Sequence, residues 1–197
     1  ESACALTSAI IFITSIYLTI ITKNYIIIFI GISGFLSLLT RLYRIYHNKY
    51  MAKFESTKML DLGSCAFRQP RANSHCKFLH GYKLYGKFTF GCNELDKNHW
   101  VVDFGGLKGL KNKLEQQFDH KTCIAADDPE IDLFREMHDK GICDLRVMHT
   151  GTGIERIAEW CYDVGRVYIE EMTRSRCWIE RVEIWEHEKN SVVITRG

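Results

Sequence analysis

A thiol and an imidazole lie close together in the segment CKFLHGYKLYGKF, which runs from Cys76 to Phe88. Cys76 precedes His80 by four residues, and His80 leads through Gly81 into an alternating, strand-like segment. A cysteine thiolate is a nucleophile or a proton carrier, and a neutral imidazole is a common metal ligand. The spacing therefore places a candidate nucleophile beside a candidate metal ligand at the beginning of a strand.

A carboxylate near the end of the chain also has an unusual position. In the alternating segment Cys177–His187, Glu186 shares a face with Val182 and Ile184. A carboxylate on an apolar face is costly unless it is hydrogen-bonded, and a ligand rich in N–H donors would supply those bonds. The alternative is that Glu186 lies past the edge of the sheet, in solvent.

Short segments of alternating or helical hydrophobicity must position these groups. Segments with a strand-like pattern are Lys53–Leu62, Lys83–Gly91, Trp100–Phe104 and Cys177–His187. Segments with helical spacing are Gly106–Phe118, Asp128–Asp139 and Thr152–Met172, and Thr152 with Glu155 resembles a capping box. This order predicts an α+β fold in which helices cover one face of an antiparallel sheet.

Composition and charge narrow the class of protein. The 197 residues carry a formal net charge of +2, and residues 1–50 hold four basic residues against Glu1. This leaves 22 basic and 23 acidic residues in 51–197, a balance that offers nucleic acid no net attraction. The eight cysteines include no CxxC pair, and a core this apolar needs no disulfide framework. Reduced thiols in a cytoplasmic setting are therefore expected for residues 51–197.

Residues 1–50 are expected to form an apolar helical segment ahead of this domain. Residues 3–22 and 25–40 are apolar, and basic and aromatic residues follow the second run. One interpretation is a transmembrane hairpin with both ends on the cytoplasmic side. The other is an upstream extension of the reading frame, because the chain begins with Glu1 and its first methionine is Met51. The two interpretations remain open.

Five short motifs occur together in an order that resembles one known family. They are Cys76-x-x-x-His80-Gly, Val101-Val-Asp-Phe-Gly-Gly-Leu-Lys108, Phe118-Asp119-His120, Gly151-Thr152-x-x-Glu155 and Val182-Glu-Ile-Trp-Glu186-His187. Each motif alone is weak. Together, from Phe54 to Gly197, they are similar to the 6-pyruvoyl-tetrahydropterin synthase and 6-carboxytetrahydropterin synthase family.

The resemblance implies a T-fold, a four-stranded antiparallel sheet with helices on one face. Copies of a T-fold close their sheets into an oligomeric barrel, here expected to be a hexamer, and closure removes exposed strand edges. The implied substrate is 7,8-dihydroneopterin triphosphate, bound between subunits. The carboxy branch releases acetaldehyde and triphosphate and leaves 6-carboxytetrahydropterin, a precursor of 7-deazapurines such as queuosine. The pyruvoyl branch eliminates triphosphate and keeps the carbons.

The resemblance also assigns roles to individual residues. Cys76 corresponds to a cysteine that moves a proton, and Asp119 with His120 corresponds to an acid–base relay. Glu186 and Thr152 correspond to substrate-binding groups. A zinc ion held by three histidines would lower the pKa of the substrate hydroxyls.

The expected set of zinc ligands is incomplete in this chain. Only His80 is a histidine, because Phe67 and Tyr82 stand at the other two ligand positions. Phenylalanine cannot ligate zinc, and a neutral tyrosine is a poor ligand. Cys65 and His75 are candidate substitutes. The alternatives are a small buried Cys65 with a solvated His75, or a pterin pocket without any metal.

Two functions follow from these observations. The first is a 6-carboxytetrahydropterin synthase-like carbon–carbon lyase with an altered zinc site, or its pyruvoyl counterpart. The second is a non-catalytic or repurposed protein that binds pterins or purines. Either protein would be tethered to a membrane only if residues 1–50 are an anchor.

Overall fold

The computed structural model describes residues 15, 34, 36–43 and 53–195. Its contacts divide the chain into two units, Glu1–Met51 and Ala52–Gly197. In the first unit, residues 36–43 are helical and exposed. None of the helices in the described part of the chain is long and apolar enough to cross a membrane. The two interpretations of residues 1–50 concern a segment that lies largely outside the described residues.

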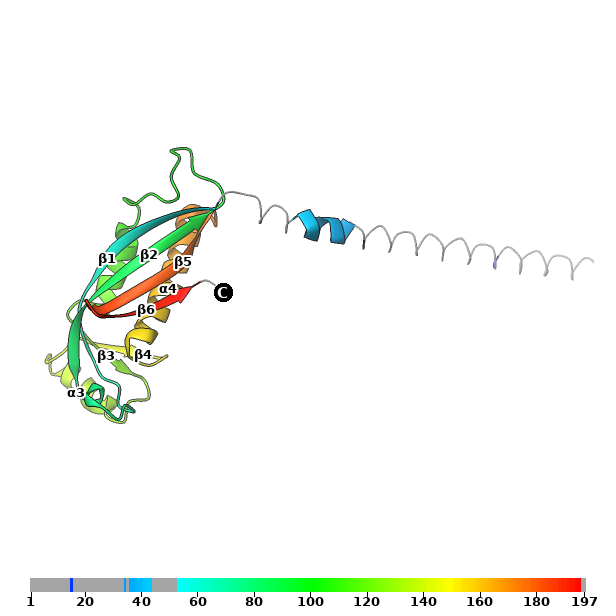
Figure 1. The fold of residues 1–197 in the computed structure, drawn as a ribbon. Coiled ribbons are helices and arrows are strands. Elements are labelled where there is room, and N and C mark those ends of the chain that lie inside the picture. The colour runs from blue at the N-terminus through cyan, green and yellow to red at the C-terminus, as the bar shows by residue number, and fades with distance from the viewer. Residues whose placement is uncertain (1–14, 16–33, 35, 44–52, 196–197) are drawn as a thin grey trace, which may run out of the picture. The chain divides into compact units, whose positions relative to one another are not determined.

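The second unit is built on a mixed sheet of six strands (Figure 1). The strands are β1 (Phe54–Phe67), β2 (His80–Cys92), β3 (Lys121–Ala125), β4 (Leu145–Met148), β5 (Cys177–His187) and β6 (Asn190–Thr195). Their order in the sheet is β4-β3-β1-β2-β5-β6. The pairs β1–β2, β2–β5 and β5–β6 are antiparallel. The pairs β1–β3 and β3–β4 are parallel.

Two long helices cover one face of the long strands. The helices are η1 (His75–Lys77, a 3₁₀ helix), α2 (Lys108–Phe118), α3 (Ile131–Asp139) and α4 (Ile154–Thr173). Helix α2 packs on β1, and α4 packs on β5 and β6. Figure 1 shows α4 behind the long strands and α3 at the end of the unit that holds β3 and β4. Helices α2 and α4 thus cover the long strands, as the sequence predicts for Gly106–Phe118 and Thr152–Met172.

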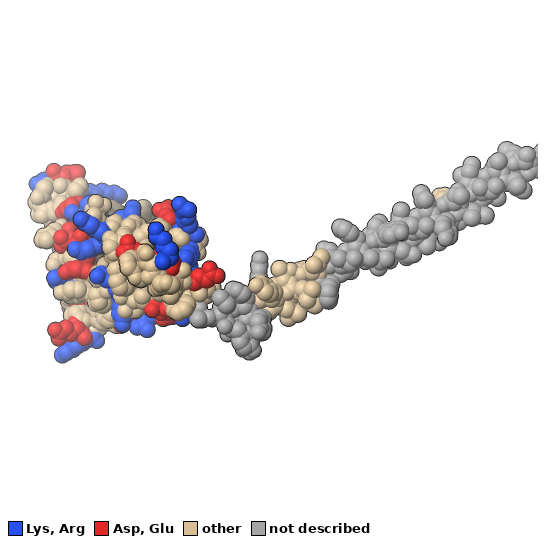
Figure 2. Space-filling view, turned by 90° about the horizontal axis from the view of Figure 1, so that it is seen from above, with Lys and Arg blue, Asp and Glu red and all other residues tan. Residues whose placement is uncertain are grey.

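The alternation in the long strands accounts for this arrangement. Leu84, Phe88 and Val182 are fully buried beneath the helices. Lys83 and Tyr85, the neighbours of Leu84 in β2, are exposed. Each strand therefore presents an apolar face to α2 and α4. The buried residues that the two helices contribute are Leu110, Leu114, Phe118, Ile157, Ala158, Cys161 and Ile169. Figure 2 shows acidic and basic side chains interspersed on one face of this unit.

The sheet is larger than the four-stranded antiparallel sheet that the sequence predicts. Strand β3 is five residues long and buried on both faces, which removes the alternation that would reveal it, and β4 has only four residues. Strand β6 follows β5 after a tight turn, and β1 continues to Phe67 rather than ending at Leu62. Apart from the strand predicted at Trp100–Phe104, the expected strands and helices are present, and β5 has the predicted bounds.

The predicted strand Trp100–Phe104 is wrong. These residues form turns and bends, and β2 pairs with β1 and β5 instead. The physical reason is that their backbone groups bond outside any sheet. The Arg176 guanidinium donates to the carbonyl oxygens of Trp100 and Val101, and the Asp96 carboxylate accepts the Trp100 N–H. The segment has an apolar pattern because Val101 and Val102, which are part of this loop, are buried.

Candidate functional site

The carboxylate and imidazole of the expected relay lie against a bulge in β1. His120 Nδ1 is 2.9 Å from Asp119 Oδ1, and the same oxygen accepts the Ser64 N–H at 3.2 Å. The His120 N–H donates to the Ser64 carbonyl oxygen at 2.8 Å. Gly63 permits this close approach, because it has φ +88° and a Cβ there would stand 2.2 Å from Asp119 Oδ1. The bulge therefore positions the pair.

Asp119 is held in its charged form. The Ser64 N–H, which outweighs partial desolvation, and the His120 ring hold the pKa of the Asp119 carboxyl below its usual value. A carboxylate that accepts an Nδ1–H fixes the ring and leaves Nε2 for proton transfer. Because the His120 side chain is 85% exposed, its Nε2 is accessible to a substrate or to another copy of the chain.

Cys76 and Thr152 are carried by neighbouring loops. Cys76 is half-buried on η1, and its carbonyl oxygen accepts the Gln69 N–H at 2.8 Å. The Thr152 hydroxyl donates to the carbonyl oxygen of Arg68. Gly153 has φ +117° and packs so tightly on Gln69 that a Cβ would lie 2.0 Å from Nε2. Residues 68 and 69, at the end of β1, thus join the two loops.

The predicted capping box of α4 is wrong. The helix begins at Ile154 with Gly153 as its N-cap, and glycine has no side chain that can cap it. The Thr152 hydroxyl bonds to Arg68 of another loop instead. This contact leaves Thr152 lining a pocket of about 360 Å³ together with Gln69, Arg71 and Asp127.

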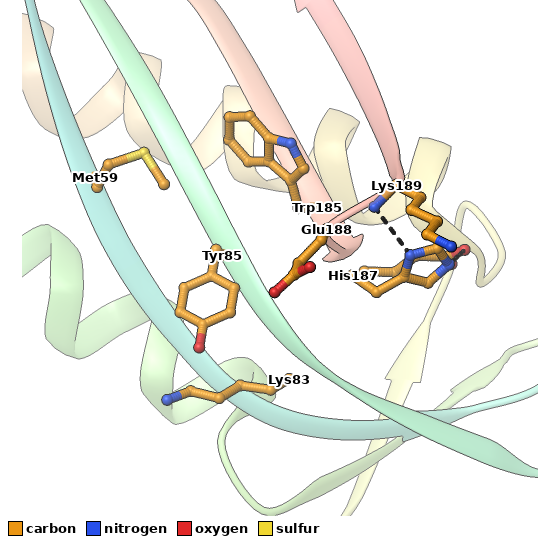
Figure 3. A pocket seen from close by; sticks show the side chains of 8 residues that line it. Met59, Lys83, Tyr85, Trp185, His187, Glu188 and Lys189 are labelled. Carbon is orange, nitrogen blue, oxygen red and sulfur yellow. Dashed lines mark hydrogen bonds and ion pairs between the residues drawn. The ribbon is translucent and has the colours of Figure 1, made fainter.

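Glu186 lies near the end of β5 and lines an open pocket of about 680 Å³. Figure 3 shows this pocket from close by. The pocket is lined by Met59, Lys83, Tyr85 and residues 185–189. Glu186 Oε1 accepts Asn190 Nδ2 at 3.1 Å. Its side chain is 18% exposed, so the carboxylate lies neither in open solvent nor in the apolar core.

The three expected metal-ligand positions do lie together. The ring centroid of Phe67 is 4.9 Å from that of His80 and 6.1 Å from that of Tyr82, and His80 and Tyr82 are 5.5 Å apart. His187, which the sequence reasoning left without a role, adds a fourth ring 5.8 Å from Tyr82. Its place in the terminal Glu186-His187 motif was the available signal. We call these four residues the ring cluster.

The candidate substitutes Cys65 and His75 do not complete a metal site with His80. Cys65 is buried, and its sulfur lies 3.3 Å from the sulfur of Cys123, between β1 and β3. His75 is exposed on η1. In the part of the chain that the structure describes, no three His, Cys, Asp or Glu residues are grouped so that they could hold a metal ion. The residues present therefore do not fit the expected zinc ion.

Within a single chain, the candidate residues Glu186, His120 and Thr152 line three different pockets. Glu186 lines the pocket beside the β5–β6 turn, His120 lines a pocket with Ser64 and Lys121, and Thr152 lines a third. Cys76 is joined to the Thr152 loop through Gln69. Contacts of Arg68 and Gln69 therefore connect the loop of Cys76 with the loop of Thr152. Asp119 and His120 are adjacent in the chain and contact each other directly.

Comparison with family models matches residues 58–197 to the family described as 6-pyruvoyl tetrahydropterin synthase. The match covers more than half of the chain. The chain belongs to this family. The family resemblance predicted from the five motifs is thereby confirmed.

Curated relatives in the 6-pyruvoyl tetrahydropterin synthase family match shorter stretches. The 6-carboxy-5,6,7,8-tetrahydropterin synthase of Rickettsia typhi is 40% identical over 57 residues, 28% of this chain and 41% of that protein. The protein of the same name from Aquifex aeolicus is 24% identical over 122 residues, 61% of this chain and 75% of that protein. The chain spans less than half the length of the Rickettsia relatives that it matches.

Solved structures of the 6-pyruvoyl tetrahydropterin synthase fold resemble this chain. An uncharacterized protein from Wolinella succinogenes has a TM-score of 0.65 at 18% identity, over 74% of this chain and 99% of that chain. The 6-pyruvoyl tetrahydropterin synthase of Plasmodium falciparum has a TM-score of 0.54 at 15% identity, over 74% and 98%. At this identity the likeness shows the fold alone, which is the predicted α+β T-fold.

Proposed function

We propose that this protein is a 6-carboxytetrahydropterin synthase-like lyase that acts on 7,8-dihydroneopterin triphosphate, in the supply of 7-deazapurines such as queuosine. The reaction would consume one water molecule, and the products would be 6-carboxytetrahydropterin, acetaldehyde and triphosphate. The observation that carries the proposal is the name shared by the curated relatives from four Rickettsia species and Aquifex aeolicus, all 6-carboxy-5,6,7,8-tetrahydropterin synthases. It favours the carboxy branch over the pyruvoyl branch.

Proton transfer in this proposal belongs to Asp119, His120 and Cys76. Asp119 is charged and fixes the His120 ring, so Nε2 can take and return a proton. The half-buried Cys76 thiol is the second proton-moving group. Glu186 would accept hydrogen bonds from the 2-amino and ring N–H groups of the pterin. Thr152 would contribute to the same substrate site.

A complete site in this proposal needs more than one copy of the chain. Glu186, His120 and Cys76 occupy separate regions of a single subunit, and His120 is exposed. We therefore propose a homo-oligomer, a hexamer by family resemblance, in which residues of different copies line one pterin cavity. Strand β6 is at one edge of the sheet and β4 is at the other, so both edges are available for pairing between copies.

No step of the proposed reaction is assigned to a metal ion, because the residues at the expected metal position do not fit one. Phe67 has no donor atom, and Cys65 and His75 do not join His80. The proposed mechanism therefore uses only the proton-transfer groups and Glu186, the carboxylate proposed to bind the pterin.

The decisive experiment is incubation of the full chain with 7,8-dihydroneopterin triphosphate, followed by product identification by mass. Parallel reactions contain added zinc or a chelator. Formation of 6-carboxytetrahydropterin with acetaldehyde supports the proposal, and a 6-pyruvoyl product assigns the chain to the other branch. The Cys76→Ala variant is the control for background chemistry.

A second function is favoured by the altered metal positions: a protein that binds pterins or purines without turning them over. Phe67 and Tyr82 remove two expected ligands while Glu186 and the relay residues are present. Equilibrium binding of a non-reactive pterin, measured by fluorescence, distinguishes the two functions. Tight binding without any product from the triphosphate would support the second function and contradict the first.

A further inference from the structure

The ring cluster has the spacing of a metal site without its ligands. Three imidazoles around a tetrahedral zinc ion, with Zn–N distances of about 2.1 Å, place their ring centroids about 5 Å from one another. The centroids of Phe67, His80 and Tyr82 are 4.9 to 6.1 Å apart. The backbone of β1 and β2 therefore directs three side chains to a common centre, although only one of them is a histidine.

Few ligand atoms are available at this centre. His80 Nδ1 is 2.7 Å from the Phe78 carbonyl oxygen, which leaves only Nε2 free to bind. Phe67 offers no donor atom and is 2% exposed, so it closes the inner side of the triangle. Tyr82 offers a phenol oxygen, which is not among the ligands that zinc prefers.

Neighbouring ligands are already engaged. His187 Nδ1 accepts the Lys189 N–H at 3.1 Å (Figure 3), and its Nε2 is 3.0 Å from Asn190 Nδ2. The Glu186 carboxylate also bonds to Asn190. The sulfur of Cys65 lies 3.3 Å from that of Cys123. A metal ion at the centre would have to break these contacts to gain a third ligand.

We propose that this protein binds no metal ion at the ring cluster, and that side-chain identity alone prevents it. The packed rings of Phe67, His80, Tyr82 and His187 fill the place of the ion, while the strands keep the geometry of a three-ligand site. The proposal has two parts: the natural chain is metal-free here, and two histidines suffice to create a site. Neither part requires a pterin, so its tests are independent of the proposed function.

The first test measures metal in the natural chain. The full chain is purified, equilibrated with Zn²⁺ or Co²⁺, freed of unbound metal and analysed by mass spectrometry for metal per chain. The expected content is far below one ion per chain and equal to that of His80→Ala. A content near one ion per chain that His80→Ala abolishes would overturn the proposal.

The second test builds the site. Phe67→His with Tyr82→His is expected to bind one Co²⁺ per chain with the visible absorption of a four-coordinate ion, and adding His80→Ala is expected to remove that absorption. The circular dichroism of each variant is compared with that of the natural chain. A folded double variant that binds no Co²⁺ would show that the three positions share no centre.

A buried histidine at position 67 is the main risk to folding, so a second variant keeps the test decisive. Tyr82→His alone changes a partly exposed ring and leaves Phe67 in the core. It places two histidines at the centre and is expected to bind Co²⁺ more tightly than the natural chain. Binding no tighter than that of the natural chain would contradict the shared geometry.

Discussion

Arg68 and Asp128, 60 residues apart in the chain, form a bidentate ion pair at the end of β1. Arg68 Nε and Nη2 donate to Asp128 Oδ2 and Oδ1 at 2.8 and 2.7 Å, and the Asp128 side chain is fully buried. The Arg68 guanidinium also lies over the Phe134 ring at 5.6 Å. The pair therefore fixes the residue whose carbonyl oxygen holds Thr152.

Replacing the buried partner should destabilise the fold. Asp128→Asn leaves Arg68 without its counter-charge, and we expect a loss of about 2–3 kcal/mol in the free energy of unfolding, measured with urea. Asp127→Asn is the matched control, because its pair with Arg71 is exposed and should contribute less than about 0.5 kcal/mol. Equal losses from both variants would contradict the assigned role of burial.

The same pair should make stability depend on pH in the acid range. Burial alone would raise the pKa of Asp128, but the hydrogen bonds from Arg68 and from the Glu130 N–H outweigh it and hold that pKa below its usual value. A depressed carboxyl pKa stabilises the fold above the unfolded pKa of about 3.9 and loses that effect as pH falls through the folded pKa. The stability difference between the natural chain and Asp128→Asn should therefore shrink below about pH 4. A difference that stays constant to lower pH would count against this linkage.

A methyl group at position 63 should disturb the relay. Gly63→Ala forces a side chain into a left-handed backbone and against Asp119, where its Cβ would lie 2.2 Å from Oδ1. Gly141→Ala is the control, because Gly141 has φ +71° and no atom within 4 Å of an added Cβ. Both variants should lose about 1 kcal/mol from the backbone, and Gly63→Ala should lose clearly more. Thermal unfolding of both variants measures the difference.

Neutralising Asp119 should slow the proposed reaction. Asp119→Asn keeps an oxygen for the Ser64 N–H but removes the charge that stabilises a protonated His120 ring. We expect kcat to fall about 100-fold with little change in thermal stability. Because the pKa of Asp119 is below its usual value, the natural chain should keep the Asp119 carboxylate charged down to about pH 4. Unchanged kcat in the variant would remove Asp119 from the mechanism.

The Cys76 thiol should matter for turnover and not for folding. Cys76→Ser should lower kcat by at least about 100-fold, because a serine hydroxyl is a far weaker acid than a thiol. Cys161→Ala is the control, since that thiol is buried in α4 and does not line the pockets that hold Glu186, Thr152 and His120. Pterin binding measured by fluorescence should be kept in both variants. Similar kcat values in the two would argue against a catalytic Cys76.

The parts of the fold that depend on local patterns were predictable. The alternation of Cys177–His187 predicts β5 with the observed bounds, and the helical spacing of Gly106–Phe118 predicts α2 within two residues. The predicted end of β1 is too early, because Gly63 is typical of a turn when its bulge partner is unknown. Strand β3 is buried on both faces in parallel pairing, where alternation disappears, and β4 has only four residues, too few for a clear pattern.

The sequence predicts some contacts of the candidate site and not others, depending on how far apart in the chain the residues lie. Asp119 and His120 are adjacent in the chain, so their contact follows from the sequence alone, and the structure has it. The Arg68–Asp128 pair joins two loops, and nothing local in either loop indicates the other. The convergence of Phe67, His80 and Tyr82 was expected from resemblance, whereas the addition of His187 depends on the pairing of β2 with β5.

The Asp119 carboxylate makes two kinds of contact. It binds the His120 ring, and it occupies the space beside Gly63 of β1 that a Cβ would otherwise fill. A relative of this chain without catalytic activity would still need a hydrogen-bond acceptor for the Ser64 N–H beside Gly63. Natural selection for foldability alone would then preserve a side-chain oxygen at this position, from aspartate or asparagine. An acidic or amide residue before histidine at this bulge is consequently explained by the fold alone, and evidence of activity has to come from Cys76 and from Glu186, the carboxylate proposed to bind the pterin.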